Sequence, residues 1–254
     1  MENNLLDYPL LIFVITLVAL WLATYVGAFF GRNLRPLKND ERDDFALVTN
    51  ASLTLLALII GFSFSMAVSR YDQRKNYEEE EANAIGTEYV RADLLPAADA
   101  SKVHELLKKY LDQRVLFYTT RNAQRIEQIN AYTAQLQSEM WSVVQGAAAA
   151  QPTCTLALAV SGMNDVLNSQ GYTQAAWWNR IPTAAWSLML AIAICCCLLT
   201  GYDARHRGAV LFTILPLVLS IALFLIADID APRAGIIRVL PQNLESLSQS
   251  LRAQ

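Results

Sequence analysis

The apolar residues of the chain fall into four long blocks separated by polar stretches. Residues 10–30 and 45–69 form two blocks without a single charged side chain, and residues 181–202 and 209–227 form two more. A helix rises about 1.5 Å per residue, so each block is long enough to cross, or nearly cross, a hydrocarbon layer of roughly 30 Å. The pattern predicts an all-α integral membrane protein, with four transmembrane helices in two hairpins flanking a soluble helical domain.

The stretch between the two hairpins has a composition typical of a water-soluble domain. It contains 11 basic and 13 acidic residues between positions 70 and 180, so it is well solvated and nearly neutral. The predicted organisation is a first hairpin over 1–69, a soluble domain over 70–180, a second hairpin over 181–229 and a C-terminal tail over 230–254.

Helix breakers are scarce in the soluble stretch, and no alternating strand pattern is present. The second span is predicted to continue past Arg70 as one long helix until Pro96. The apolar run 153–167 contains Asn164 and Asp165 and is too short to span, which favours a buried or interfacial helix. Further helices are predicted over 100–122, 124–149 and 152–168, with Gly171 as a stop signal.

Composition and charge agree with the membrane interpretation and exclude several functions. The chain is 54% hydrophobic and 17% charged, and its net charge of -3 gives no indication of a nucleic-acid partner. Its two histidines are far apart, and Cys195, Cys196 and Cys197 point about 100° apart on a helix, so they cannot converge on one metal ion. We therefore expect no metal site, no cofactor and no enzymatic activity.

Charged residues gather where the second span leaves the membrane. Arg70, Arg74 and Lys75 follow the apolar block, and an acidic run from Glu78 to Glu81 comes next. The basic residues suit either anchoring to lipid headgroups or a charged ring at a pore mouth. The acidic run suits either a solvated helix face or an ion site that needs several copies around an axis.

Several motifs resemble the bacterial bestrophin-like domain family, which is distantly similar to the bestrophin anion channels. The resemblance rests on Gly61-Phe62, Ser69 to Asp72, Glu80 to Thr87, Arg91 to Pro96, and Asp228 to Gly235 after the last span. It covers most of residues 45–240. The resemblance gives rise to expectations about assembly and function.

The resemblance implies a ring of five subunits around a pore that is lined by the second span and conducts inorganic anions. Gly61-Phe62 is similar to the hydrophobic neck of bestrophins, and steps of one helical turn from Phe62 add Leu58 and Thr54. Pore-mouth charges would then come from Arg70, Arg74, Lys75, Glu78 and Glu81, and the family motif after the last span from Asp228, Asp230, Pro232 and Gly235. Calcium gating is not implied, because Arg233 replaces an aromatic residue and the dense acidic run is missing.

Other interpretations stay open on the residues alone. Small and hydroxylated side chains in 45–69 serve helix packing as well as a wet path, so a membrane-anchored scaffold or sensor without conduction is the alternative. Basic residues near the spans number six on each side, so they do not decide the topology. The resemblance places the helical domain in the cytoplasm of a multi-pass protein of the bacterial inner membrane.

Overall fold

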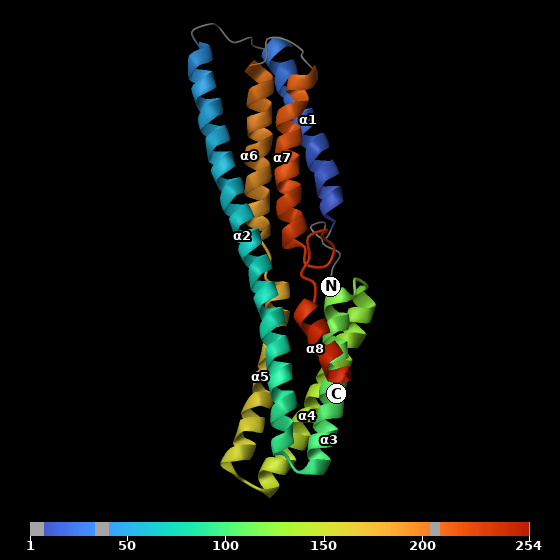
Figure 1. The fold of residues 1–254 in the computed structure, drawn as a ribbon. Coiled ribbons are helices and arrows are strands. Elements are labelled where there is room, and N and C mark those ends of the chain that lie inside the picture. Colours follow the sequence, from blue (N-terminus) through green and yellow to red (C-terminus); the bar gives the residue numbers. More distant parts are fainter. Residues whose placement is uncertain (1–7, 34–40, 204–208, 254) are drawn as a thin grey trace. The chain divides into compact units, whose positions relative to one another are not determined.

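The computed structural model describes residues 8–33, 41–203 and 209–253, and within them every regular element is a helix (Figure 1). Four of these helical stretches are long and apolar enough to cross a membrane, which confirms the predicted fold class. The helices are α1 (Pro9–Asn33), α2 (Glu41–Arg91), η2 (Ala92–Leu94), α3 (Ala97–Thr119), α4 (Ala123–Ala150), α5 (Cys154–Trp178), α6 (Thr183–Asp203), α7 (Ala209–Asp230) and α8 (Gln242–Arg252).

Helix α2 is one uninterrupted helix of 51 residues. It passes Arg70 without a break and ends at Arg91, where the short 3-10 helix η2 leads to Pro96 at the start of α3. The predicted continuation of the second span is thus confirmed. Its cause is the absence of proline and of a glycine cluster over the whole stretch, since proline disfavours helical geometry at the preceding residue.

The chain divides into two compact units. The membrane unit comprises Glu2–Arg70 and Arg180–Ile237, and the helical unit comprises Tyr71–Asn179 and Arg238–Gln254. The C-terminal tail contributes α8, which packs on α3. Four of the basic residues counted near the spans lie outside the described residues: Arg35, Lys38, Arg205 and Arg207.

In the membrane unit, α1 packs along α6 and α7 (Figure 1). Two glycines one turn apart on α1 allow the close approach: a Cβ at Gly27 would lie 2.1 Å from the carbonyl oxygen of Leu198, and one at Gly31 would lie 2.3 Å from that of Tyr202. This spacing of small residues lets helix backbones meet in lipid, where no hydrophobic force drives helices together. Buried Cys196 and Cys197 belong to the same packed core.

The helical unit has its own core, formed by α3, α4 and α5 together with parts of α2 and α8. Tyr110, Phe117 and Met140 are among its fully buried side chains. Helix α5 runs to Trp178, so the expectation that Gly171 stops it is wrong. The residues beyond this glycine include Thr173, Ala176 and Trp177, which are buried, and their packing outweighs the low helix propensity of one glycine.

Candidate functional site

The three expected neck residues lie on one exposed face of α2. Phe62 is 65% exposed, Leu58 is 54% exposed and Thr54 is also exposed. The opposite side of the same helix carries buried Leu56 and Ala67, which face the membrane unit. Because Thr54, Leu58 and Phe62 are each four residues apart, they form one stripe along the helix.

This outward face of α2 differs in polarity from the outward faces of α1 and α7. On α1, residues 10–30 expose only aliphatic and aromatic side chains, and the hydroxyls of Thr16 and Thr24 are buried. On α7, the exposed large side chains are all aliphatic and Ser220 is buried. The outward face of α2 instead mixes Leu58 and Phe62 with the exposed polar residues Asn50, Thr54, Ser65 and Ser69.

A helix facing lipid has its polar groups turned inward, as α1 and α7 do. Two hydroxyls on α2 donate back to their own helix: Thr54 Oγ1 to the carbonyl of Asn50 at 2.8 Å, and Ser52 Oγ to that of Val48 at 2.8 Å. Thr54 is exposed and Ser52 is half-buried. This arrangement suits contact with water or with polar groups of another chain better than contact with hydrocarbon.

The part of α2 that belongs to the helical unit exposes a different set of charges from the one expected. Among the predicted pore-mouth residues, Lys75 is exposed. Asp72, Glu79 and Glu80 share its exposure, and so do the uncharged residues Gln73, Asn76 and Asn83. Acidic groups thus outnumber basic groups on the exposed part of this stretch of the helix.

Arg70 is held within its own chain by an ion pair. Its Nη1 lies 3.4 Å from Oδ1 of Asp230, and the two side chains are only 14% and 5% exposed. The carboxylate of Asp230 also accepts the backbone N–H of Ile181, at 3.2 Å and 3.1 Å from its two oxygens. One carboxylate thereby joins the end of the second span, the start of the second hairpin and the end of the last span.

Asp228 holds the turn that follows α7. Its two carboxylate oxygens accept the backbone N–H groups of Ile236 and Ile237, at 2.7 Å and 2.8 Å. Pro232 is buried where the chain leaves the helix, as its missing N–H and fixed φ favour. A Cβ at Gly235 would lie 2.2 Å from the carbonyl oxygen of Asp228, so the turn needs glycine there. The motif after the last span therefore stabilises the turn that follows α7.

Arg74 and Glu78 are buried, each 1% exposed, and they hold helix ends of the helical unit. The guanidinium of Arg74 donates to the carbonyl oxygens of Ala176 and Asn179, at 3.3 Å and 3.4 Å, at the C-terminus of α5. The carboxylate of Glu78 accepts the N–H groups of Asn243 and Leu244 at 2.9 Å and 3.0 Å, at the N-terminus of α8. Each charge meets the helix end that its sign favours.

Glu81 lies in a fully buried polar cluster. It accepts hydrogen bonds from Arg114, from the hydroxyl of Thr173 at 3.1 Å and from Tyr118 at 3.4 Å. The expectation that Arg74, Glu78 and Glu81 form a charged ring is therefore corrected, because all three side chains are used inside their own chain. Glu78 and Glu81 are three residues apart and share a face with buried Ile85, and this spacing is the sequence signal that distinguishes them from Glu79 and Glu80.

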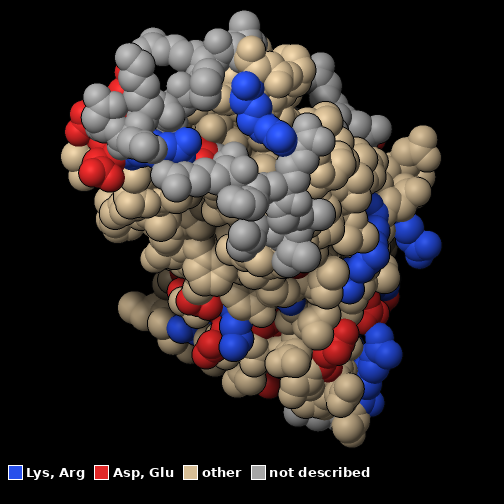
Figure 2. Space-filling view, turned by 90° about the horizontal axis from the view of Figure 1, so that it is seen from above, with Lys and Arg blue, Asp and Glu red and all other residues tan. Residues whose placement is uncertain are grey.

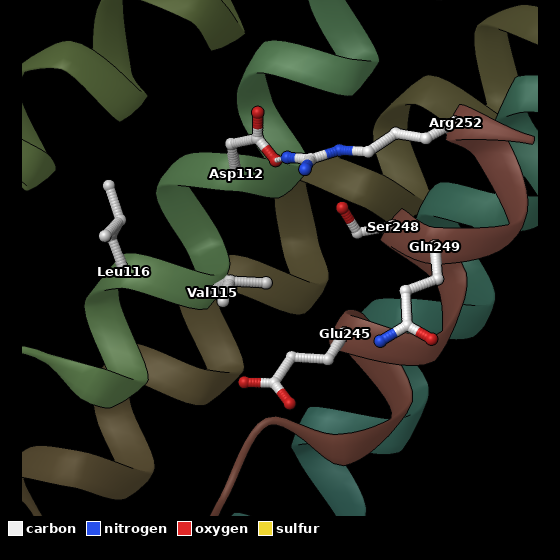
Figure 3. A pocket seen from close by; sticks show the side chains of 7 residues that line it. All are labelled: Asp112, Val115, Leu116, Glu245, Ser248, Gln249 and Arg252. Atoms are coloured by element: carbon white, nitrogen blue, oxygen red, sulfur yellow. Dashed lines mark hydrogen bonds and ion pairs between the residues drawn. The ribbon is translucent and has the colours of Figure 1, made fainter.

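Among the residues that Figure 2 colours, most of the surface seen from the loop end of the spans is neither acidic nor basic. The helical unit has an open cleft between α3 and α8 (Figure 3). Asp112 and Arg252 reach across it at 2.8 Å, above Val115 and Leu116. The cleft has no buried polar group that points into it among its described lining residues, so it carries no chemistry that would make it the centre of the site.

The comparisons with known proteins agree with this fold. The family model described as Bestrophin-like domain matches residues 11–244. A crystal structure of a mutant bestrophin homologue from Klebsiella pneumoniae superposes with a TM-score of 0.66 at 14% identity, covering 95% of this chain and 98% of that one. A second mutant of that homologue gives a TM-score of 0.67 at 12% identity, covering 95% and 94%. At these identities the likeness establishes the fold. No curated protein matches the chain.

Proposed function

This chain belongs to the Bestrophin-like domain family, and from that membership we propose that it assembles as a ring and conducts small inorganic ions along α2. It is a multi-pass membrane protein. The observation that carries the proposal is the outward face of α2, which mixes polar side chains with Leu58 and Phe62, while α1 and α7 turn theirs inward.

The geometry of α2 supports the proposed ring. A single mixed-polarity face cannot enclose a path, whereas several copies around an axis would line one with Thr54, Leu58 and Phe62 from each chain. One exposed aromatic per subunit would then close a narrow apolar girdle, which passes ions only when it is wetted. We propose Phe62 and Leu58 as this neck, and five as the number of subunits by analogy with the family resemblance.

The sign of the conducted ion is a separate question. The resemblance implies anions, with Arg70 and Arg74 as attracting charges. Arg74 is buried and Arg70 is paired with Asp230, which removes both from the exposed face of α2. Beyond Arg70, the charged residues that α2 exposes as far as Glu80 are Asp72, Glu79 and Glu80 against Lys75. A ring multiplies that excess of negative charge, so this observation favours a cation path as the second candidate.

The assembly is tested by its mass and by cross-linking. We expect a ring mass in lipid nanodiscs, and efficient intersubunit cross-linking of a single Phe62→Cys introduced after replacement of the four native cysteines. Val18→Cys on α1 is the matched control, since Val18 is also exposed in a span but belongs to the apolar outward face of α1. A monomer in nanodiscs, or equal cross-linking of both positions, contradicts the proposal.

Ion selectivity is tested by the reversal potential of reconstituted protein under a salt gradient. If exposed acids line the path, the reversal potential should be shifted toward the equilibrium potential of the cation. Glu80→Gln should move the reversal potential toward zero. A reversal potential on the anion side would restore the selectivity that the resemblance implies.

The helical unit is proposed to lie in the cytoplasm, which accessibility labelling of Cys154 in intact cells can test, because this cysteine is exposed and belongs to that unit.

A further inference from the structure

Glu88 is an acidic side chain of α2 that is completely buried in the helical unit. Its exposure is 0%, and neither carboxylate oxygen has a hydrogen-bond partner among the described residues. Buried polar groups in proteins are nearly always hydrogen-bonded, and an unpaired buried charge is costly. Glu88 thus differs from Glu78 and Glu81 on the same helix, whose carboxylates accept several hydrogen bonds.

The carboxyl group lies where α2 and α5 pack against each other in opposite directions. Along this pair, Arg74 meets Ala176, Glu81 meets Thr173, and Arg91 approaches Asp165 at 3.9 Å. One turn before Asp165 on α5, Gly162 faces Glu88: a Cβ there would lie 2.0 Å from Glu88 Oε2 and 2.8 Å from Arg91 Nη1. The missing side chain of Gly162 is what gives the carboxyl its space.

Charged and titratable groups near this part of α2 lie on four elements, α2, η2, α3 and α5. Arg91 lies one turn further along α2, and Asp165 lies on α5. From α3, Lys108 lies over the ring of Tyr89, and His104 contacts the backbone carbonyl of Tyr89 at 2.8 Å. His104 Nε2 is also 3.5 Å from Oδ1 of Asp93. None of these groups forms an ion pair or a hydrogen bond with the Glu88 carboxyl.

We propose that Glu88 is a proton-binding site that makes the contact between α2 and α5 sensitive to pH. The protonated side chain is neutral and can remain in its place against Gly162, whereas the ionised side chain is an unpaired buried charge that loosens the contact. Burial raises the pKa of Glu88 to about 8, with Arg91 lowering it and Asp165 raising it in part. The site is therefore occupied by a proton at neutral pH and is emptied in the mildly alkaline range.

The direction of the pH effect follows from linkage. The pKa of Glu88 is higher in the folded chain than the ordinary value of 4.5, so the folded state binds the proton more tightly. The stabilisation is complete below pH 4.5, is lost as pH rises toward 8, and changes no further above it. Within that window, opening of the α2–α5 contact should increase by up to about tenfold per pH unit.

The test uses the full chain in nanodiscs and compares it with Glu88→Gln, which imitates the protonated side chain. Infrared difference spectra should contain a protonated-carboxyl band in the wild type that titrates at about pH 8 and is absent from Glu88→Gln. Hydrogen exchange of residues 160–166, taken as the ratio of wild type to Glu88→Gln at each pH, should rise up to pH 8 and then level off. The ratio cancels the intrinsic pH dependence of exchange.

Two further variants serve as controls. Glu80→Gln removes the same type of group from an exposed position of α2 and should leave the band and the exchange ratio unchanged. His104→Gln replaces the ring that contacts the backbone carbonyl of Tyr89 and should also leave the carboxyl band in place. The proposal is overturned if Glu88→Gln retains the band, if the band titrates in the ordinary carboxyl range, or if the exchange ratio stays flat with pH.

Discussion

Arg70 at the end of the second span and Asp230 at the end of the fourth form an ion pair at 3.4 Å, within the membrane unit. Asp230 makes more of these contacts than Arg70, because its carboxylate is 5% exposed and also accepts the N–H of Ile181. The pair fixes the ends of helices that are far apart in the sequence. The contact gives Asp230, an acidic residue at the end of the last span, a structural role within the chain.

Replacing Asp230 should therefore destabilise the membrane unit. Asp230→Ala leaves the guanidinium of Arg70 and the N–H of Ile181 without this acceptor, and each such loss costs about 1–3 kcal/mol. Thermal unfolding in detergent should show a lower midpoint than the wild type. Arg70→Ala should have a smaller effect, since Asp230 keeps its backbone donor; an equal or larger effect of Arg70→Ala would contradict this ranking.

The glycines of α1 give a prediction with a control inside the same chain. Gly27→Ala places a methyl group 2.1 Å from the carbonyl oxygen of Leu198, so α1 and α6 must separate, and overpacking of this type costs about 1–3 kcal/mol. Gly61→Ala on α2 meets no atom within 4 Å. Loss of monodisperse protein in detergent on heating should be earlier for Gly27→Ala and unchanged for Gly61→Ala. Equal sensitivity of both variants would mean that the α1–α6 contact is not this close.

The cap that Glu78 provides can be removed without touching the spans. Glu78→Ala deprives the first N–H groups of α8 of their acceptor, and the loss of a helix cap costs about 1 kcal/mol. Limited proteolysis should then cut between Val239 and Leu251 faster than in the wild type. Glu79→Ala, which changes an exposed neighbour, should leave the cleavage rate unaltered, and faster cleavage in that variant would contradict the assignment.

The spans could be predicted from the sequence because their signal is local. The length of a charge-free apolar block decides whether a helix can cross a bilayer, and the absence of breakers decides that α2 continues to Arg91. The extension of α5 past Gly171 could not be predicted in this way, since it depends on the burial of Thr173 and Trp177 among other helices. Local propensity and tertiary packing give opposite answers there.

The candidate site was predictable only in part, for a similar reason. Helical spacing is enough to put Thr54, Leu58 and Phe62 on one face. Glu78 points inward toward Asn243, which is 165 residues away, and Glu81 points toward Arg114, which is 33 residues away. A run of four acids does not identify these distant partners. Likewise, nothing next to Glu88 in the sequence indicates that Gly162 makes room for it.

The central claim, an ion path constricted by Phe62, is tested most directly by ion flux from liposomes that contain the purified protein. Phe62→Ala should widen the neck and raise the flux several-fold above the wild type. Phe64→Ala is the matched control: it is also exposed on α2, but two residues at about 100° each place it on the far side of the helix. We expect its flux to equal that of the wild type. If the wild type and Phe62→Ala are both impermeable to small cations and anions, the chain is not a channel, and the membrane-anchored scaffold takes its place.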